Sequence, residues 1–102
     1  MNVIENGMAE MALQPLRFKI IKILQKNGAM YLEQIAQLLQ ENPRLIAHHL
    51  EILLDAGLVR DRFDVITAKA SRRKAVARFF ELTPKASMLL VEIAKAVSME
   101  GG

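Results

Sequence analysis

The spacing of apolar residues changes once along this chain, at Gly57, and the change limits the possible folds. Before Gly57, apolar residues recur every three or four positions, which is the spacing of amphipathic helices. After it, residues 58–66 alternate between apolar and polar, with Val59, Phe63 and Val65 on one side, as in a half-buried strand. The pattern predicts a series of helices followed by a β-hairpin.

Prolines and glycines mark where the predicted helices begin and end. Pro15, Pro43 and Pro84 can each occupy the first position of a helix, with Asn42 and Thr83 as caps. Gly57 can end a helix in the left-handed conformation. The predicted helices cover residues 3–13, 15–27, 32–39, 43–56 and 84–98. The predicted strands cover residues 29–31, 58–66 and 75–82, and the hairpin tip is Ala70 to Arg73.

The third and fourth predicted helices are separated by about three residues, which is the arrangement of a helix-turn-helix. The hairpin follows directly, in the position of a wing. We therefore expect a mainly α fold with a small β-hairpin, a winged helix-turn-helix flanked by N- and C-terminal helices. At 102 residues, the chain is the size of one domain, 1–102.

The composition and motifs exclude several classes of protein. The chain contains no Cys, which rules out a disulfide scaffold, a thiolate metal site and a cysteine nucleophile. It carries no Gly-rich phosphate loop and no H-E-x-x-H motif, so we expect neither an enzyme nor a cofactor. No apolar run reaches about 18 residues, and the acidic N-terminus does not resemble a signal peptide. These features predict no membrane span and a cytoplasmic protein.

Positive charge is concentrated in one segment. Residues 60–78 contain seven Lys or Arg and two Asp, a net charge of +5, whereas the whole chain has a net charge of +3. A clustered basic patch is typical of a nucleic-acid binder, and a solvated polar loop is the alternative. The polar face of the 15–27 helix is expected to carry further basic residues: Arg17, Lys19, Lys22 and Lys26.

Three stretches resemble the ArsR-type winged-helix transcription repressors. Residues 15–21, PLRFKII, are similar to that family's P-x-R-x-x-I-L opening. Residues 46–59, IAHHLEILLDAGLV, are similar to its recognition helix and exit, V-S-x-H-L-x-x-L-x-x-A-G-L-V. Residues 80–85, FELTPK, resemble the Y-x-L-T-P-K that leaves the wing in several winged-helix families. The resemblance covers about residues 13–98 and implies a homodimeric regulator of double-stranded DNA, expected to be a repressor.

The metal sensing of many ArsR-type proteins is not implied here. Residues 30–33, MYLE, replace the C-x-C motif, and the last predicted helix contains neither His nor Asp. The two histidines, His48 and His49, diverge by about 100° on a helix and cannot share one ion. We expect no metal, and the sequence does not indicate whether a small-molecule effector exists.

The outward, N-terminal half of the 43–56 helix is the predicted DNA-reading surface. When Leu50 is taken as the centre of the buried face, Arg44, Leu45 and His48 point away from it. In helix-turn-helix proteins, this half enters the major groove. Arg44 can pair with guanine, Leu45 can contact a thymine methyl, and His48 can donate to a base or a phosphate. A solvated helix face is the alternative.

Further residues are assigned to DNA contact or to its support. His49 lies at the edge of the buried face and is expected to be structural or to contact a phosphate. Arg72, Arg73 and Lys74 at the wing tip suit contact with phosphates or the minor groove. The aromatic residues of the hairpin are expected to pack it on the core rather than to stack on bases: Phe63, Phe79 and Phe80.

The last predicted helix is apolar on more than one face, so a monomer would leave part of it uncovered. A two-fold dimer would cover both terminal helices, although the two could instead cover each other within one chain. The expected dimer interface comprises Ile4, Met8, Met11, Met88, Leu90, Val91 and Val97. The alternative function is a winged-helix protein–protein interaction module without specific DNA binding, which the basic wing, Arg44 and His48 disfavour.

Overall fold

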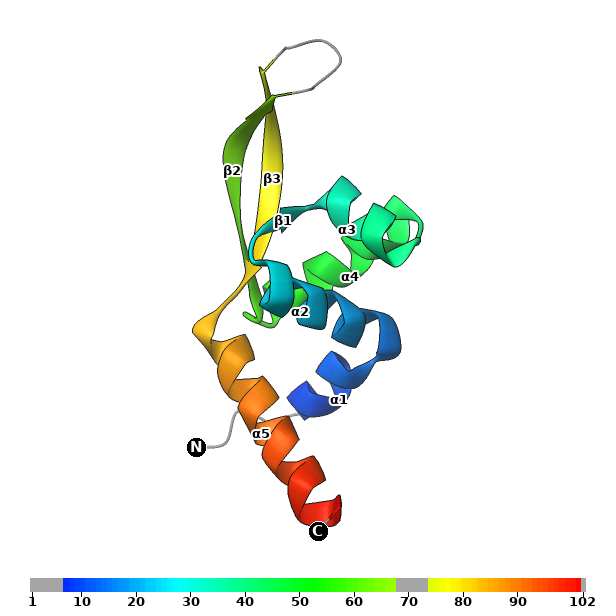
Figure 1. The fold of residues 1–102 in the computed structure, drawn as a ribbon, viewed down its shortest axis with the longest axis vertical. Helices are drawn as coiled ribbons and strands as arrows, with labels where there is room; N and C mark the ends of the chain where they lie inside the picture. Colours follow the sequence, from blue (N-terminus) through cyan, green and yellow to red (C-terminus); the bar gives the residue numbers. More distant parts are fainter. Residues whose placement is uncertain (1–6, 68–73, 102) are drawn as a thin grey trace.

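The computed structural model describes residues 7–67 and 74–101 (Figure 1). The elements in chain order are α1 (Met8–Leu13), α2 (Pro15–Asn27), β1 (Met30–Tyr31), α3 (Leu32–Leu39), α4 (Pro43–Asp55), β2 (Val59–Thr67), β3 (Lys74–Leu82) and α5 (Pro84–Gly101). The predicted mainly α fold with a small β-hairpin is confirmed. Within the two described ranges, no helix is both long and apolar enough to cross a membrane.

The starts of α4 and α5 follow from their caps, as the sequence predicts. The side-chain oxygen of Asn42 accepts a hydrogen bond from the backbone N–H of Arg44 at 2.7 Å. The hydroxyl of Thr83 accepts one from the backbone N–H of Ala86 at 3.3 Å. Each bond satisfies an N–H group that has no partner inside its helix, so the caps fix the residue at which each helix begins.

The end of α4 is stabilised by the start of α5. Gly57 has a φ of +74°, the left-handed conformation predicted for it. The hydroxyl of Thr83 donates to the carbonyl of Gly57 at 2.7 Å, and Lys85 Nζ donates to the carbonyl of Ala56 at 3.0 Å. The exit from α4 and the entry into α5 therefore form one hydrogen-bonded unit.

The sheet has three strands in the order β1-β3-β2, and both pairings are antiparallel. Met30 of β1 pairs with Phe80 of β3, and the β2–β3 ladder runs from the Val59–Leu82 pair to the Thr67–Lys74 pair. We call β2 and β3 the wing. Because β1 pairs only with the base of β3, the outer part of the wing projects away from the helices (Figure 1).

The core lies where α2, α3, α4 and α5 meet the base of the wing. Its largest fully buried side chains are Ile20, Ile21, Ile35, Ile46, Leu50, Leu53, Leu58 and Leu89. Phe80, which is 4 % exposed, joins the sheet to this cluster. The core thus packs α4 against the base of the wing.

Two predicted helix bounds differ in the structure. The first helix begins at Met8 rather than Val3, because Gly7 has a φ of +74°, and residues 3–6 lie outside the described residues. The last helix continues to Gly101, three residues beyond its predicted end at Ser98. The predicted hairpin tip, residues 70–73, also lies outside the described residues.

One predicted packing role on the wing is wrong. Phe63 is 70 % exposed, although it shares a face of the hairpin with the buried Val59. Phe63 lies four residues outward from Val59 on β2, the edge strand of the sheet, and the described residues leave most of its ring uncovered. Phe80 packs in the core as predicted, and Phe79 is half-buried against Tyr31, with ring centroids 5.4 Å apart.

Candidate nucleic-acid interface

The N-terminal half of α4 presents polar and apolar side chains to solvent. Arg44 and His48 are exposed, and Leu45 is 41 % exposed. Ile46 and Leu50, on the opposite face, are buried in the core. The structure therefore brings the three side chains predicted to read DNA onto one surface.

His49 lies below that surface and contacts Arg17 of α2. It is 7 % exposed, and its Nδ1 lies 3.2 Å from Arg17 Nη1. A guanidinium can only donate, so the Nδ1 atom accepts and the imidazole carries its proton on Nε2. Arg17 Nε also donates to the carbonyl of Met11 at 2.8 Å. The pair links α4 to α2 and to the end of α1.

The environment of His49 favours the neutral imidazole. Burial lowers the pKa of His49 below its ordinary value of 6.5, and the charges of Arg17 and His48 lower it further. The sequence pattern placed Arg17 on the polar face of its helix, which is wrong, because the side chain turns toward α1 and α4. The arginine of the P-x-R motif was the signal that could have marked this contact.

Carboxylates neutralise much of the positive charge on the described part of the wing. Arg62 Nη1 lies 2.8 Å from Asp64 Oδ2. The Nε atoms of Arg60 and Arg62 each lie 3.5 Å from Glu81 Oε1. The hydrogen bonds from the Val65 N–H and from Arg62 hold the pKa of Asp64 below its usual value. The net charge of +5 over residues 60–78 already counts Asp61 and Asp64, and the carboxylates of Glu51 and Glu81, which lie outside that segment, lower the local charge further.

Lys74 lies at the described end of β3 and is exposed. Arg72 and Arg73, the other two predicted contacts of the wing tip, lie outside the described residues.

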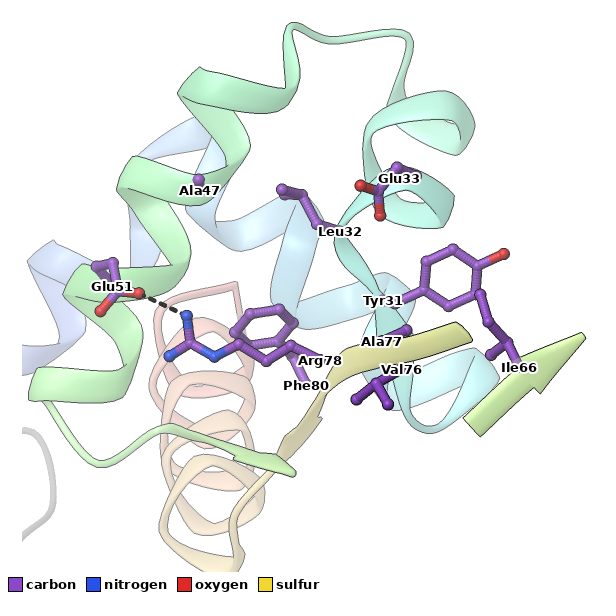
Figure 2. Close-up of a pocket in the computed structure, with 10 residues that line it drawn as sticks. All are labelled: Tyr31, Leu32, Glu33, Ala47, Glu51, Ile66, Val76, Ala77, Arg78 and Phe80. Carbon is purple, nitrogen blue, oxygen red and sulfur yellow. Dashed lines mark hydrogen bonds and ion pairs between the residues drawn. The ribbon is translucent and has the colours of Figure 1, made fainter. Parts of the chain in front are cut away.

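A groove of about 550 Å³ separates the wing from α3 and α4 (Figure 2). Its walls include the apolar side chains of Leu32, Ala47 and Phe80. At one end, Arg78 Nη1 donates to Glu51 Oε1 at 3.0 Å, so a charged contact bridges α4 and β3 across the groove. The sequence did not reveal this bridge, since its two residues are 27 positions apart.

The predicted dimer residues of α5 divide into two groups. Met88, Val91 and Val97 are exposed, whereas Leu90 is half-buried and packs against the core. A second groove, of about 540 Å³, runs between α2 and α5 and is lined by Phe18, Leu90, Val91 and Val97 among others. The structure thus leaves an apolar surface along α5.

The predicted dimer residues of the N-terminus lie elsewhere. Met8 and Met11 of α1 are half-buried and pack against the core, and Ile4 lies outside the described residues.

In residues 7–67 and 74–101, no three His, Cys, Asp or Glu side chains come together in a group that could hold a metal ion. The His48 and His49 rings meet edge to face, with centroids 5.2 Å apart.

The helical part of the chain matches a known family. Residues 14–61 match the family model described as bacterial regulatory protein, arsR family. Over 48 residues, the chain is 42 % identical to an uncharacterised helix-turn-helix-type transcriptional regulator of Methanocaldococcus jannaschii. That alignment covers 47 % of this chain and 54 % of the relative, so the chain spans about half the length of the curated relative it matches.

Solved structures share most of the fold. A possible transcriptional regulator for arsenical resistance superposes with a TM-score of 0.65 at 25 % identity, covering 87 % of this chain and 81 % of that one. A transcriptional regulator homologue from Pyrococcus horikoshii gives 0.65 at 19 % identity, covering 94 % and 90 %. A protein with a GntR superfamily winged-helix-turn-helix domain from Halomicrobium mukohataei gives 0.67 at 22 % identity, covering 84 % and 61 %.

The family match and the fold agree with each other. The matched segment contains α2 to α4, and the hairpin that follows occupies the place of the wing in the similar winged-helix structures. The matched family consists of regulators of transcription and not of enzymes. Residues 14–61 are therefore an ArsR-type helix-turn-helix segment, and the fold that contains them is that of winged-helix transcription regulators.

Proposed function

We propose that this protein is a cytoplasmic homodimer that binds double-stranded DNA at specific sites and represses transcription. The observation that carries the proposal is the outward N-terminal half of α4, capped by Asn42 and backed by the core. In helix-turn-helix proteins this half of the second helix enters the major groove. Repression is carried over from the resemblance to the ArsR type.

The three outward side chains assigned to DNA reading have separate roles. Arg44 donates two hydrogen bonds to guanine O6 and N7, and Leu45 contacts a thymine methyl. His48 donates to a base or a phosphate. His49 acts through Arg17, because 7 % exposure leaves little of its ring available to DNA.

The wing supplies the contacts that do not depend on the DNA sequence. Lys74 is exposed at its described end, and Arg72 and Arg73 follow the same assignment from the sequence alone. These side chains neutralise phosphates on the backbone or beside the minor groove.

A two-fold dimer explains the exposed apolar surface of α5. The six-residue α1 is too short to cover the eighteen-residue α5, and residues 94–98 of α5 are all exposed. A second copy packed along Val91 and Val97 would bury these side chains and the groove beside them. The two α4 helices would then meet half-sites about 34–36 Å apart.

Selection from a random pool of duplexes, followed by affinity measurement on the selected and on a random duplex, tests the proposal. We expect enrichment of a near-palindromic site and a specific affinity at least about 10³-fold above that for random DNA. Enrichment of no sequence, with equal affinity for all duplexes, would contradict sequence-specific binding.

One observation favours the alternative of a protein–protein interaction module. Phe63, Val65 and Val76 lie on one face of the wing, are large and apolar, and are exposed. An apolar surface of this kind is common where proteins bind one another. The alternative would replace DNA binding if the protein retained no duplex at low salt.

A further inference from the structure

One arginine of the wing is held by two carboxylates from different elements. Arg78 Nη1 donates to Glu51 Oε1 of α4 at 3.0 Å, and Arg78 Nε donates to Asp61 Oδ2 of β2 at 2.5 Å. The guanidinium also lies 5.0 Å from the centroid of the buried Phe80 ring. The fork of an arginine can make both bonds at once, which a lysine ammonium cannot do with the same geometry.

The two carboxylates fix Arg78 in its charged form. Its hydrogen bonds to Asp61 and then to Glu51 raise the pKa of Arg78 above its usual value. Both acceptors belong to the protein, so a phosphate would have to compete with Asp61 and Glu51 for the charge of Arg78. Arg78 therefore differs from Lys74 in what it can do, although both are basic residues of β3.

Glu51 belongs to the same face of α4 as the side chains assigned to base reading. Arg44, His48, Glu51 and Asp55 follow one another at intervals of four, three and four residues, which places them along one side of a helix. The bridge to Arg78 thus ties this face of α4 directly to β3 (Figure 2).

On the face of the hairpin that carries Arg78, few other contacts hold the outer part of the wing. Phe63, Val65 and Val76, which follow Asp61 and Arg78 outward along the same face of the hairpin, are exposed. The core holds the wing at Phe80, two residues from Arg78, and farther out Val76 and Ile66 face α3 only across the groove. The contacts of Arg78 lie where the outer part of the wing begins, so they are placed to set the angle between the wing and the helices.

We propose that Arg78 is a positioning residue, which through Glu51 and Asp61 sets the angle between the wing and α4 so that both reach one DNA site. This inference rests on the proposed DNA binding. In a regulator of this design, α4 reads bases while the wing holds phosphates, and the two succeed together only at the correct separation. Loss of the bridge lowers the affinity for the specific site more than for random DNA.

Two substitutions that change the net charge by the same amount test the role of the bridge. Glu51→Ala and Asp55→Ala each remove one exposed negative charge from the same face of α4, and only the first breaks the contact with Arg78. We expect Asp55→Ala to strengthen binding to all duplexes slightly. Glu51→Ala should weaken binding to the selected duplex about fivefold, with a smaller loss on random DNA. A Glu51→Ala protein that gains affinity for both duplexes, as Asp55→Ala does, would overturn the proposal.

The angle of the wing can be measured without DNA. The chain contains no Cys, so spin labels can be placed at two introduced cysteines, Leu38→Cys on α3 and Val65→Cys on β2, both at exposed sites. Labelled protein is diluted with unlabelled protein, and the distribution of distances between the two labels is recorded by double electron–electron resonance. We expect Glu51→Ala and Arg78→Lys to broaden the distribution and Asp55→Ala to leave it unchanged.

Equal distribution widths in all these proteins would show that Arg78 does not set the wing angle. If no duplex binds the parent protein, the proposed function fails by that result, and the distance distributions still decide whether the bridge positions the wing.

Discussion

The contact between Arg17 and His49 makes the support of α4 sensitive to pH. His49 accepts a hydrogen bond from a permanently charged donor, so protonation of its ring removes the acceptor and places two positive charges together. The pKa of His49 is lowered in the folded state, and the unfolded state therefore binds the proton more readily. The folded state loses stability as the pH falls through 6.5 toward the lowered pKa.

We expect the parent protein to have a lower free energy of unfolding at pH 5.5 than at pH 7.5. His49→Gln, whose amide oxygen can still accept from Arg17, should lose less over the same range. The exposed neighbour His48 provides the control, since His48→Gln should retain most of the pH dependence of the parent. Urea unfolding at both pH values measures this, and an equal pH dependence in the parent and His49→Gln would contradict the assignment.

The two wing phenylalanines that share a face should respond very differently to truncation. Phe80→Ala removes a 4 % exposed ring from the core and is expected to cost about 3–5 kcal/mol of unfolding free energy. Phe63→Ala removes a 70 % exposed ring and should change it by less than about 0.5 kcal/mol. Denaturant titration of both variants checks this difference. A large loss for Phe63→Ala would show that something covers this ring in solution.

At the scale of elements, the wing's basic residues should fall into two groups. Lys74→Ala is expected to reduce the slope of log affinity against log salt by about one, because a phosphate contact releases a counterion. Arg62→Ala should change the slope by less, since Asp64 and Glu81 already pair with Arg62 within the wing. Affinities on a random duplex at several salt concentrations measure both slopes. Equal reductions would indicate that the ion pairs of Arg62 open on DNA.

The elements themselves could be predicted because their signals are local. Each helix that begins at a proline has that residue fixed by sterics and by a cap nearby, so α2, α4 and the start of α5 lie where the sequence placed them. The alternation after Gly57 also gave the strands of the wing within a residue at each end. The outward face of α4 followed from its period alone.

The contacts between elements could not be predicted by the same reasoning. The Arg17–His49 and Arg78–Glu51 contacts join residues 32 and 27 positions apart, and no spacing rule links such pairs. The exposure of Phe63 was missed for a related reason. The alternation assigns a residue to one face of a strand, but it does not say which residues on that face are covered by the rest of the protein.

At the scale of the whole molecule, the proposed binding to two half-sites requires two copies of the chain. Val91→Glu places a charge in the apolar surface of α5, where the exposed Val91 lines the groove beside α2, and should split the dimer. Ala96→Glu introduces the same side chain at an exposed position outside the lining of that groove and should leave the dimer intact.

Sedimentation at several protein concentrations tests the assembly. The parent and Ala96→Glu should sediment as two chains of 11.5 kDa, and Val91→Glu as one. The monomeric variant should also lose affinity for a two-half-site duplex. A parent protein with the mass of a single chain at all concentrations would contradict the dimer.

The most direct test of the account is the affinity of the parent and of Arg44→Ala for a selected and for a random duplex, measured at several salt concentrations. Base contacts discriminate between sequences, so Arg44→Ala is expected to cost about 1–3 kcal/mol on the selected duplex and little on the random one. Lys74→Ala, the control, should weaken both alike. Equal weakening of both duplexes by Arg44→Ala, or a parent protein that binds neither, would contradict the claim that α4 reads DNA sequence.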